Sequence, residues 1–160
     1  MMPTRRALFR LAAVPLLPAA ARADEPGVRG LQSWTRATPG AGRTAAIYLT
    51  LEAVGAPDRL TGAKSPAAAM AMLHESYTEN GIARMRMLDG VDLPAGRKVV
   101  LKPDGMHIML TGLRHALRRG DKVEVTLTFA NAKPLTVKVP VLAANTPSPD
   151  GETMPGMNGP

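Results

Sequence analysis

The chain has 160 residues, a net charge of +7 and no cysteine, and 45% of its residues are hydrophobic. This length suits one domain with its own hydrophobic core, and the lack of cysteine excludes disulfides as a source of stability. The first 23 residues hold four arginines and no acidic residue, so the remaining 137 carry only +3. That remainder has four aromatic residues, Trp34, Tyr48, Tyr77 and Phe129. They are too few for a base-stacking platform, so we expect no nucleic-acid partner.

Residues 1–23 have the features of a secretory signal peptide. Three arginines precede a short apolar stretch at 11–20, and a small-x-small cleavage site follows at 21–23. Residues 4–10 also resemble a twin-arginine signal, and the sequence leaves the twin-arginine and Sec routes equally open. The apolar stretch is shorter than the ~20 residues of a membrane-spanning helix. We therefore predict a periplasmic protein that is cleaved near Ala23 and has no membrane anchor.

The middle of the chain has the pattern of an all-β domain. Short apolar stretches are separated by turn residues about every 8 to 12 residues, as in a sandwich or barrel. Several stretches alternate polar and apolar residues, and Asn80-Gly81 is the clearest hairpin turn. Strands are expected at 31–37, 45–53, 58–63, 69–76, 83–88, 97–101, 107–111, 122–129 and 135–142.

The pattern indicates a single folded domain with segments at both ends. We expect the signal peptide at 1–23 to be followed by an N-terminal lead at 24–30 and one β-sandwich domain at 31–143. Residues 144–160 are rich in proline and glycine, so we expect a flexible tail there.

Two histidines and two methionines form the pattern His-x10-Met-x21-His-x-Met, at His74, Met85, His107 and Met109. Imidazole plus thioether is a ligand set for copper, above all Cu(I), because soft sulfur donors select the cuprous ion. His107 and Met109 lie two residues apart on one expected strand, so they point to one face about 6.6 Å apart. His74 and Met85 lie on strands joined through Asn80-Gly81 and should approach each other. Taken singly, such residues are more often core methionines and hydrogen-bonded histidines.

This pattern and its surroundings resemble the periplasmic copper chaperones called PCu(A)C. The resemblance runs from about residue 31 to 141 and includes, besides the four residues, the segments 33–40, 44–49, 101–105 and 120–121. It implies a single Greek-key β-sandwich, cupredoxin-like or immunoglobulin-like, that carries one Cu(I) on His74, Met85, His107 and Met109. It also implies the copper-centre subunit of cytochrome c oxidase and Sco-type thiol proteins as partners. Binding of Cu(II) stays open.

Three further methionines are candidate copper ligands. Met87 has the same facing parity as Met85 and is an auxiliary candidate, although a packing or surface role is more common for a methionine. Met154 and Met157 lie in the tail at a Met-x2-Met spacing that suits a second ion. For these two, as for Met87, the structural interpretation is the more common one.

Five other residues are expected to have structural roles. Met72 and Met106 are interpreted as core residues, and His115 as an exposed loop residue. Trp34 and Arg36 match the first strand of the family and are expected to serve packing and a structural hydrogen bond.

Enzymatic activity is not expected. The sequence has no Gly-x-Ser-x-Gly motif and no carboxylate pair near a histidine, and the lack of cysteine excludes a blue-copper centre. Scavenging or buffering of copper with the same ligands is the main alternative to delivery. A metal-free interaction module is a third possibility, and it predicts that replacing all four residues changes nothing. We expect a monomer in the absence of metal.

Overall fold

The structure is a computed structural model that describes residues 27–147. The expected signal peptide and the tail methionines Met154 and Met157 lie outside the described residues. Every element of the described part is a β-strand, and none of it forms a helix long and apolar enough to cross a membrane. The strands are β1 (Gly27–Arg36), β2 (Ala45–Val54), β3 (Asp58–Lys64), β4 (Ala68–Glu79), β5 (Ile82–Leu88), β6 (Val91–Leu93), β7 (Lys98–Leu101), β8 (Met106–Leu113), β9 (Lys122–Phe129) and β10 (Leu135–Leu142).

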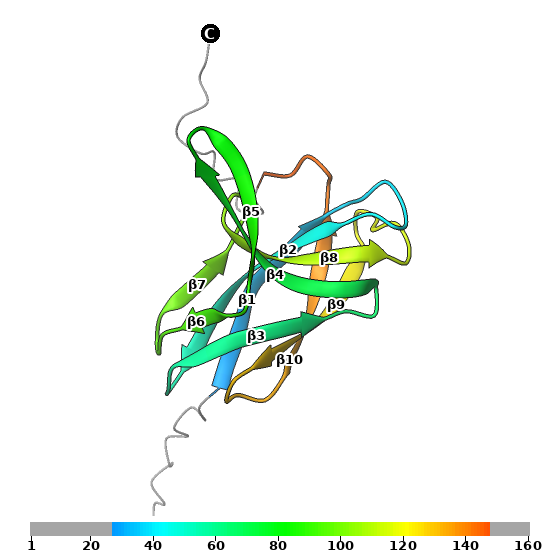
Figure 1. Ribbon diagram of the computed structural model, residues 1–160. Helices are drawn as coiled ribbons and strands as arrows, with labels where there is room; N and C mark the ends of the chain where they lie inside the picture. The colour runs from blue at the N-terminus through cyan, green and yellow to red at the C-terminus, as the bar shows by residue number, and fades with distance from the viewer. Residues whose placement is uncertain (1–26, 148–160) are drawn as a thin grey trace, which may run out of the picture.

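The strands form two layers (Figure 1). One layer has the order β5-β4-β8-β2-β1, with β7 also paired to β2, and the other has the order β10-β9-β3-β6. Parallel pairing of β1 with β10, at Thr35 with Val141, joins the layers. The other strand pairs are antiparallel, which suits sheets with one face on the core and one toward solvent. The predicted all-β sandwich is confirmed.

The core lies between the inner faces of the two layers. Ile47, Leu49 and Leu51 of β2 are 0–1% exposed, as are Ile108 and Leu110 of β8. They meet a matching set from the second layer, which includes Leu60, Val125, Leu127, Val139 and Val141. Because side chains alternate across a strand, the inward direction of Ile108 places its neighbours on the outer face of the first layer.

The structure departs most clearly from the expected strands in three places. β1 begins at Gly27, inside the segment that was expected to be a lead, because Gly27–Leu31 pairs with β2. β4 extends to Glu79, since it pairs with β5 along its whole length. β6 was not expected, because three residues are too short for a visible alternation, yet Leu93 is fully buried and pairs with Asp58.

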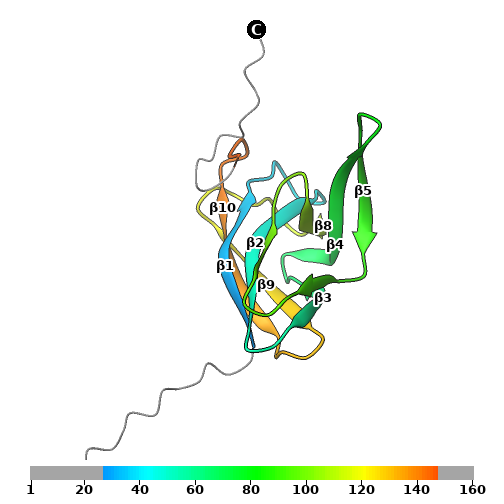
Figure 2. The ribbon, with the colours of Figure 1, turned by 90° about the vertical axis from the view of Figure 1, so that its left-hand side faces the viewer.

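The tip of the β4–β5 hairpin, beyond the part of β4 that pairs with β8, stands away from the two layers (Figure 2). Its turn was predicted: Asn80 and Gly81 both have positive φ, 51° and 76°, as a type I′ turn requires. Residues 82–87 of β5 are exposed, and β5 is an edge of the sheet. The turn and the pairing with β4 therefore hold β5 in place, rather than burial of its side chains.

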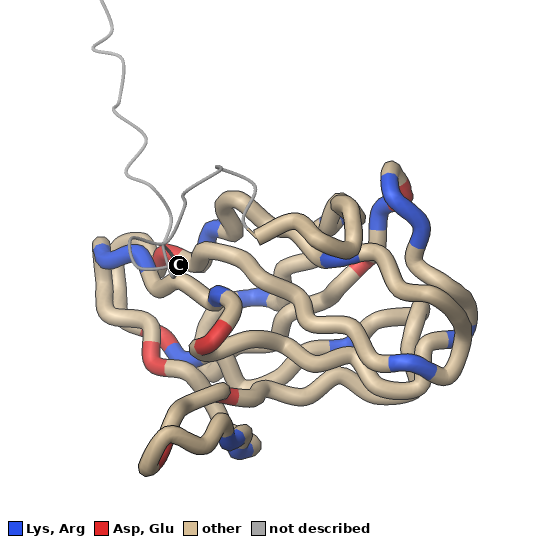
Figure 3. The backbone as a smooth tube through the Cα atoms, turned by 90° about the horizontal axis from the view of Figure 1, so that it is seen from above, with Lys and Arg blue, Asp and Glu red and all other residues tan. Residues whose placement is uncertain are grey.

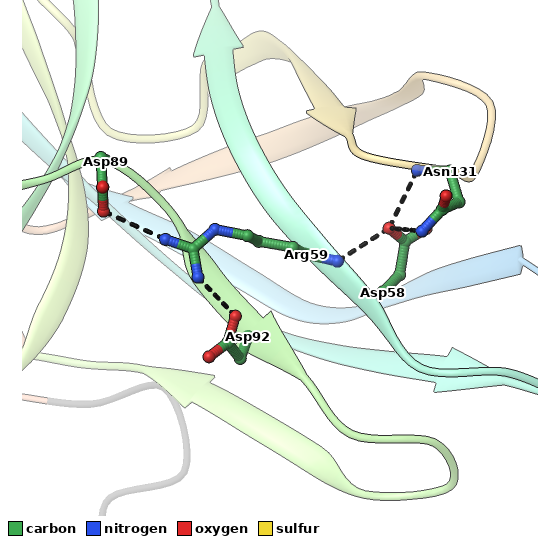
Figure 4. A network of polar contacts seen from close by, with 5 residues as sticks. All are labelled: Asp58, Arg59, Asp89, Asp92 and Asn131. Carbon is green, nitrogen blue, oxygen red and sulfur yellow. Dashed lines mark hydrogen bonds and ion pairs between the residues drawn. The ribbon is translucent and has the colours of Figure 1, made fainter.

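A polar network holds the chain where β5 ends (Figure 4). Arg59 of β3 forms ion pairs with Asp89, at 3.0 Å, and with Asp92. Beside it, the Asp58 carboxylate accepts hydrogen bonds from the backbone amides of Arg59, Asn131 and Ala132 at 2.7–3.0 Å. Burial of the carboxylate raises its pKa, but these hydrogen bonds together lower it by more. The pKa of Asp58 therefore lies below its ordinary value. The base of the hairpin is thus tied to β3 while its tip projects.

Candidate metal centre

His74 and His107 lie directly opposite each other on β4 and β8. Their ring centroids are 6.1 Å apart, with the ring planes inclined at 73°. Leu73 and Ile108, which are adjacent to His74 and His107 along the two strands, are buried in the core. Because side chains alternate across a strand, His74 and His107 both lie on the outer face of the first layer. Antiparallel pairing thus brings together two imidazoles that are far apart in the sequence.

Met109 extends this face along β8. It pairs with Met72 of β4, one step from the histidine pair, and it is partly buried. The residue between His107 and Met109 is Ile108, which is fully buried in the core as expected. His107 and Met109 therefore form the same-face pair that their spacing predicted.

Met85 also lies on this face, but it is not the residue directly opposite His74. In the pairing of β4 with β5, the residue directly opposite Met85 is Ser76, and the residue directly opposite His74 is Met87. Met85 is consequently a diagonal neighbour of His74, at a position where Cα atoms are separated by about 7–8 Å and long side chains still meet. The expected approach of His74 and Met85 through the hairpin is thus a diagonal one.

The ring of His107 is held in one orientation. Its Nδ1 atom lies 2.9 Å from the carbonyl oxygen of Gly105. A carbonyl can only accept, so Nδ1 carries the proton and Nε2 of the neutral ring keeps its lone pair. The Gly105 carbonyl thus fixes the tautomer and orientation that a ligating histidine needs, and the sequence did not indicate this contact.

The ring of His74 has a polar atom without a partner. Its Nδ1 is buried and makes no hydrogen bond with any described residue. Burial, and next the charge of neighbouring His107, lower the pKa of His74 below its ordinary 6.5, which favours the neutral ring. A buried unpaired nitrogen costs about 1–3 kcal/mol, and an ion bound at the site is one explanation of such an atom.

Aromatic side chains close one side of the site. The Tyr48 ring lies 6.3 Å from His107 and 4.5 Å from Trp34. The Arg36 guanidinium lies over both aromatic rings, at 5.4 and 5.8 Å, and donates to the Thr146 carbonyl at 2.7 Å. These contacts confirm the expected packing and hydrogen bond of Trp34 and Arg36. His107, beside Tyr48, is only 4% exposed.

Desolvation also acts on Tyr48. Burial raises the pKa of its phenol, with Arg36 lowering it and Asp104 raising it to smaller extents. Tyr48 therefore borders the site as an uncharged phenol at physiological pH.

The charged residues of the described part are distributed over the molecule (Figure 3). Lys and Arg positions are spread over several strands and loops (Figure 3). The pairs Glu75–Arg86 and Glu79–Arg84 lie on the opposite face of the hairpin from Met85. Within residues 27–147, no group of three or more His, Cys, Asp or Glu side chains is placed to hold a metal. Methionine side chains share this face with the histidine pair.

The structure corrects the interpretation of Met72. It was expected in the core, but it is partly buried on the same face as His74 and lies outside the core cluster. Met106, with the other parity, packs against the core as expected, and His115 is exposed in a loop. The parity of Met72 with His74 was visible in the sequence, whereas its pairing with Met109 was not.

The family follows from comparison with known proteins. The sequence profile described as "Putative lipoprotein LpqE-like" matches residues 30–141. The chain belongs to this LpqE-like family. A protein of Leifsonia xyli subsp. xyli named "Putative lipoprotein Lxx21020" is 39% identical over 116 residues, which cover 72% of this chain and 69% of that protein.

Two solved structures with the same fold are described as copper-bound. The copper-bound PCuAC domain from PmoF2 has a TM-score of 0.61 and 26% identity, covering 72% of the LpqE-like chain and 92% of that domain. The solution structure of CuI-DR1885 from Deinococcus radiodurans has a TM-score of 0.59 and 32% identity, covering 78% and 83% of the two chains. The β-sandwich of the LpqE-like protein is thus the fold of PCuAC domains.

Proposed function

We propose that this LpqE-like protein is an exported, non-enzymatic copper chaperone that carries one Cu(I) ion on His74, His107, Met109 and Met85. The observation that carries the proposal is the direct pairing of His74 with His107 on a face that also bears methionines. The copper named in the two similar structures supports the choice of metal. Copper is here the cargo of the protein rather than a resident cofactor.

The donor set suits the cuprous ion. A metal about 2.0–2.1 Å from a ring nitrogen lies roughly 3 Å from the ring centroid. Two centroids 6.1 Å apart are therefore compatible with one shared ion. Thioethers select Cu(I) over harder ions, and they cannot form disulfides in an oxidising compartment. The lowered pKa of His74 keeps its lone pair available to the metal.

The site has one buried side and one accessible side, which suits a carrier. His107 is 4% exposed, whereas Met85 on the edge hairpin is 50% exposed. An acceptor can therefore reach the ion from the β5 side while the imidazoles still hold it. Four neutral ligands leave the charge of the ion uncompensated, so a thiolate acceptor would withdraw it readily. With all four positions filled by the protein, no position is left for a substrate.

The recipient is a separate part of the proposal. Resemblance to the PCu(A)C chaperones supports delivery to the copper centre of cytochrome c oxidase, together with Sco-type thiol proteins, and a periplasmic location. Buffering of excess copper uses the same site. Deletion of the gene distinguishes the two: lower oxidase activity under copper limitation supports delivery, whereas sensitivity to added copper alone supports buffering.

The names of the relatives bear on where the protein is located. The family description and the Leifsonia protein name a lipoprotein. These names support the proposed export of this chain.

An anaerobic titration tests the copper site. The protein is titrated with Cu(I) against a chromophoric chelator, together with His107→Ala and, as a matched control, the exposed loop variant His115→Ala. We expect one tightly bound ion in the wild type and in His115→Ala, and strongly weakened binding in His107→Ala. A wild type that does not compete with the chelator would end the copper proposal. The same titration with Cu(II) decides whether the oxidised ion also binds.

A further inference from the structure

We infer that Met87 is a further copper ligand that can take the place of Met85. The ion then has two alternative sulfur atoms on the hairpin. This inference rests on the proposed function, since it concerns the same site. It assigns a role to a methionine that lies outside the His-x10-Met-x21-His-x-Met pattern.

The strand register carries the inference. Met87 is the residue of β5 that lies directly opposite His74, and Met85 is directly opposite Ser76. Directly opposed side chains have Cβ atoms about 4.5–5.5 Å apart, closer than the diagonal distance. The position nearest to His74 on the hairpin is therefore occupied by a thioether that the motif does not count.

The exposure of Met87 is a second, independent observation. Its side chain is 69% exposed, the highest among the exposed large hydrophobic residues of the described part. Packing thus does not account for this methionine. It lies on an edge strand beside an imidazole whose buried Nδ1 has no hydrogen-bond partner among the described residues.

The hairpin holds both thioethers on the same face. Arg86, between Met85 and Met87, points to the opposite face, where it pairs with Glu75 at 2.6 Å and lies 5.4 Å over the Tyr77 ring. With Arg86 tied down there, the two sulfur-bearing side chains leave the strand on one side about 6.6 Å apart. Neither is covered, so each is free to turn toward His74.

Interchange of the two sulfurs provides a step in copper transfer. The bond from Cu(I) to the Met85 sulfur breaks as the bond to the Met87 sulfur forms, and the copper stays Cu(I) because no electron moves. The two imidazoles and Met109 hold the ion meanwhile. The ion moves toward the most exposed part of the site, where an incoming thiolate takes the vacated position.

Leucine variants test the inference, because leucine keeps the apolar volume and removes the sulfur. The set is Met85→Leu, Met87→Leu and the double variant, with Met70→Leu as the control. Met70 is 55% exposed on the same face of β4 but pairs with Thr111, away from the histidines. We expect each single variant to lose about tenfold or less in Cu(I) affinity, and the double variant to lose more than the product of the two, as interacting neighbours do. Met85→Leu combined with Met70→Leu should match Met85→Leu alone.

A direct readout is the methyl NMR signal of methionine. In Met85→Leu protein labelled at the methionine methyl carbons, addition of Cu(I) or Ag(I) should shift the Met87 signal and leave Met70 unchanged. The inference is wrong if the Met87 signal does not move, or if Met85→Leu is already as weak as the double variant while the wild type binds Cu(I). A wild type that binds no Cu(I) contradicts the proposed function and the inference with it.

Discussion

The two ends of the proposed copper site are built in opposite ways. On β8, His107 is 4% exposed, is walled by Tyr48 and is oriented by the Gly105 carbonyl. On β5, Met85 is 50% exposed on a hairpin that projects from the sandwich. The first end is fixed before the metal arrives, whereas the second can adjust. A carrier needs both, because a fixed end binds the ion and an adjustable end allows it to leave.

The largest expected effect is on the β8 end, through the core. Leu110 is fully buried on the inner face of β8. Leu110→Ala should lower the free energy of unfolding by about 2–5 kcal/mol, because it removes packed methyl groups and leaves a cavity. Met85→Ala on the exposed hairpin should stay within ~0.5 kcal/mol of the wild type. Urea denaturation measures both, and equal losses would contradict the division between a packed end and an adjustable end.

The two ends should also differ in copper affinity. Loss of His107 removes a preoriented ligand from a buried position, so His107→Ala should weaken Cu(I) binding by more than about 100-fold, which exceeds the usual effect of losing a residue that only orients a ligand. Met85→Leu should cost about tenfold or less, because Met87 replaces the sulfur. Chelator competition gives both values, and circular dichroism checks that His107→Ala is folded. A larger loss in Met85→Leu than in His107→Ala would reverse the comparison.

The turn of the hairpin gives a smaller, local effect. Gly81 has φ +76°, a conformation that costs other residues about 1–2 kcal/mol. Gly81→Ala should raise the rate of amide hydrogen exchange in β5 and leave the exchange rates in β8 unchanged. Gly40→Ala is the control, since a Cβ there meets nothing within 4 Å and Gly40 does not need positive φ. Faster exchange in β8 would show that the hairpin is not an independent unit.

The smallest expected effect is the pH dependence from His74. Its pKa is lowered, by burial first and by His107 second. Above the unfolded pKa of about 6.5 the ring is neutral in both the folded and the unfolded state, and the free energy of unfolding has its full value. As pH falls from there through the lower folded pKa, the unfolded chain takes up the proton first, and the free energy of unfolding decreases. An NMR titration of the metal-free protein should place the His74 midpoint below 6.5, and a higher midpoint would contradict the burial of its ring.

The sequence predicted most of the sandwich and the shared face of His107 and Met109. Both follow from period-two alternation, which is a property of each strand alone. The pairing between strands could not be read in this way. The register that places His74 opposite His107, and Met87 rather than Met85 opposite His74, depends on how β4, β5 and β8 align.

Interactions between different parts of the chain were also missed. The Gly105 carbonyl that orients His107 comes from a turn, and the Tyr48 wall comes from β2. No local pattern marks either of them. Met72 shows the same limit, because its parity indicated the outer face and a methionine at that position was still interpreted as core.

The most direct test of the account is X-ray absorption at the copper edge of the Cu(I)-loaded protein, compared with Cu(I)-loaded Met85→Leu. The account predicts a first shell that contains both nitrogen and sulfur, from two imidazoles and two thioethers, with the sulfur count unchanged in Met85→Leu because Met87 takes the place of Met85. A shell without nitrogen, or one without sulfur, would contradict a copper site built on the His74–His107 pair and its methionines.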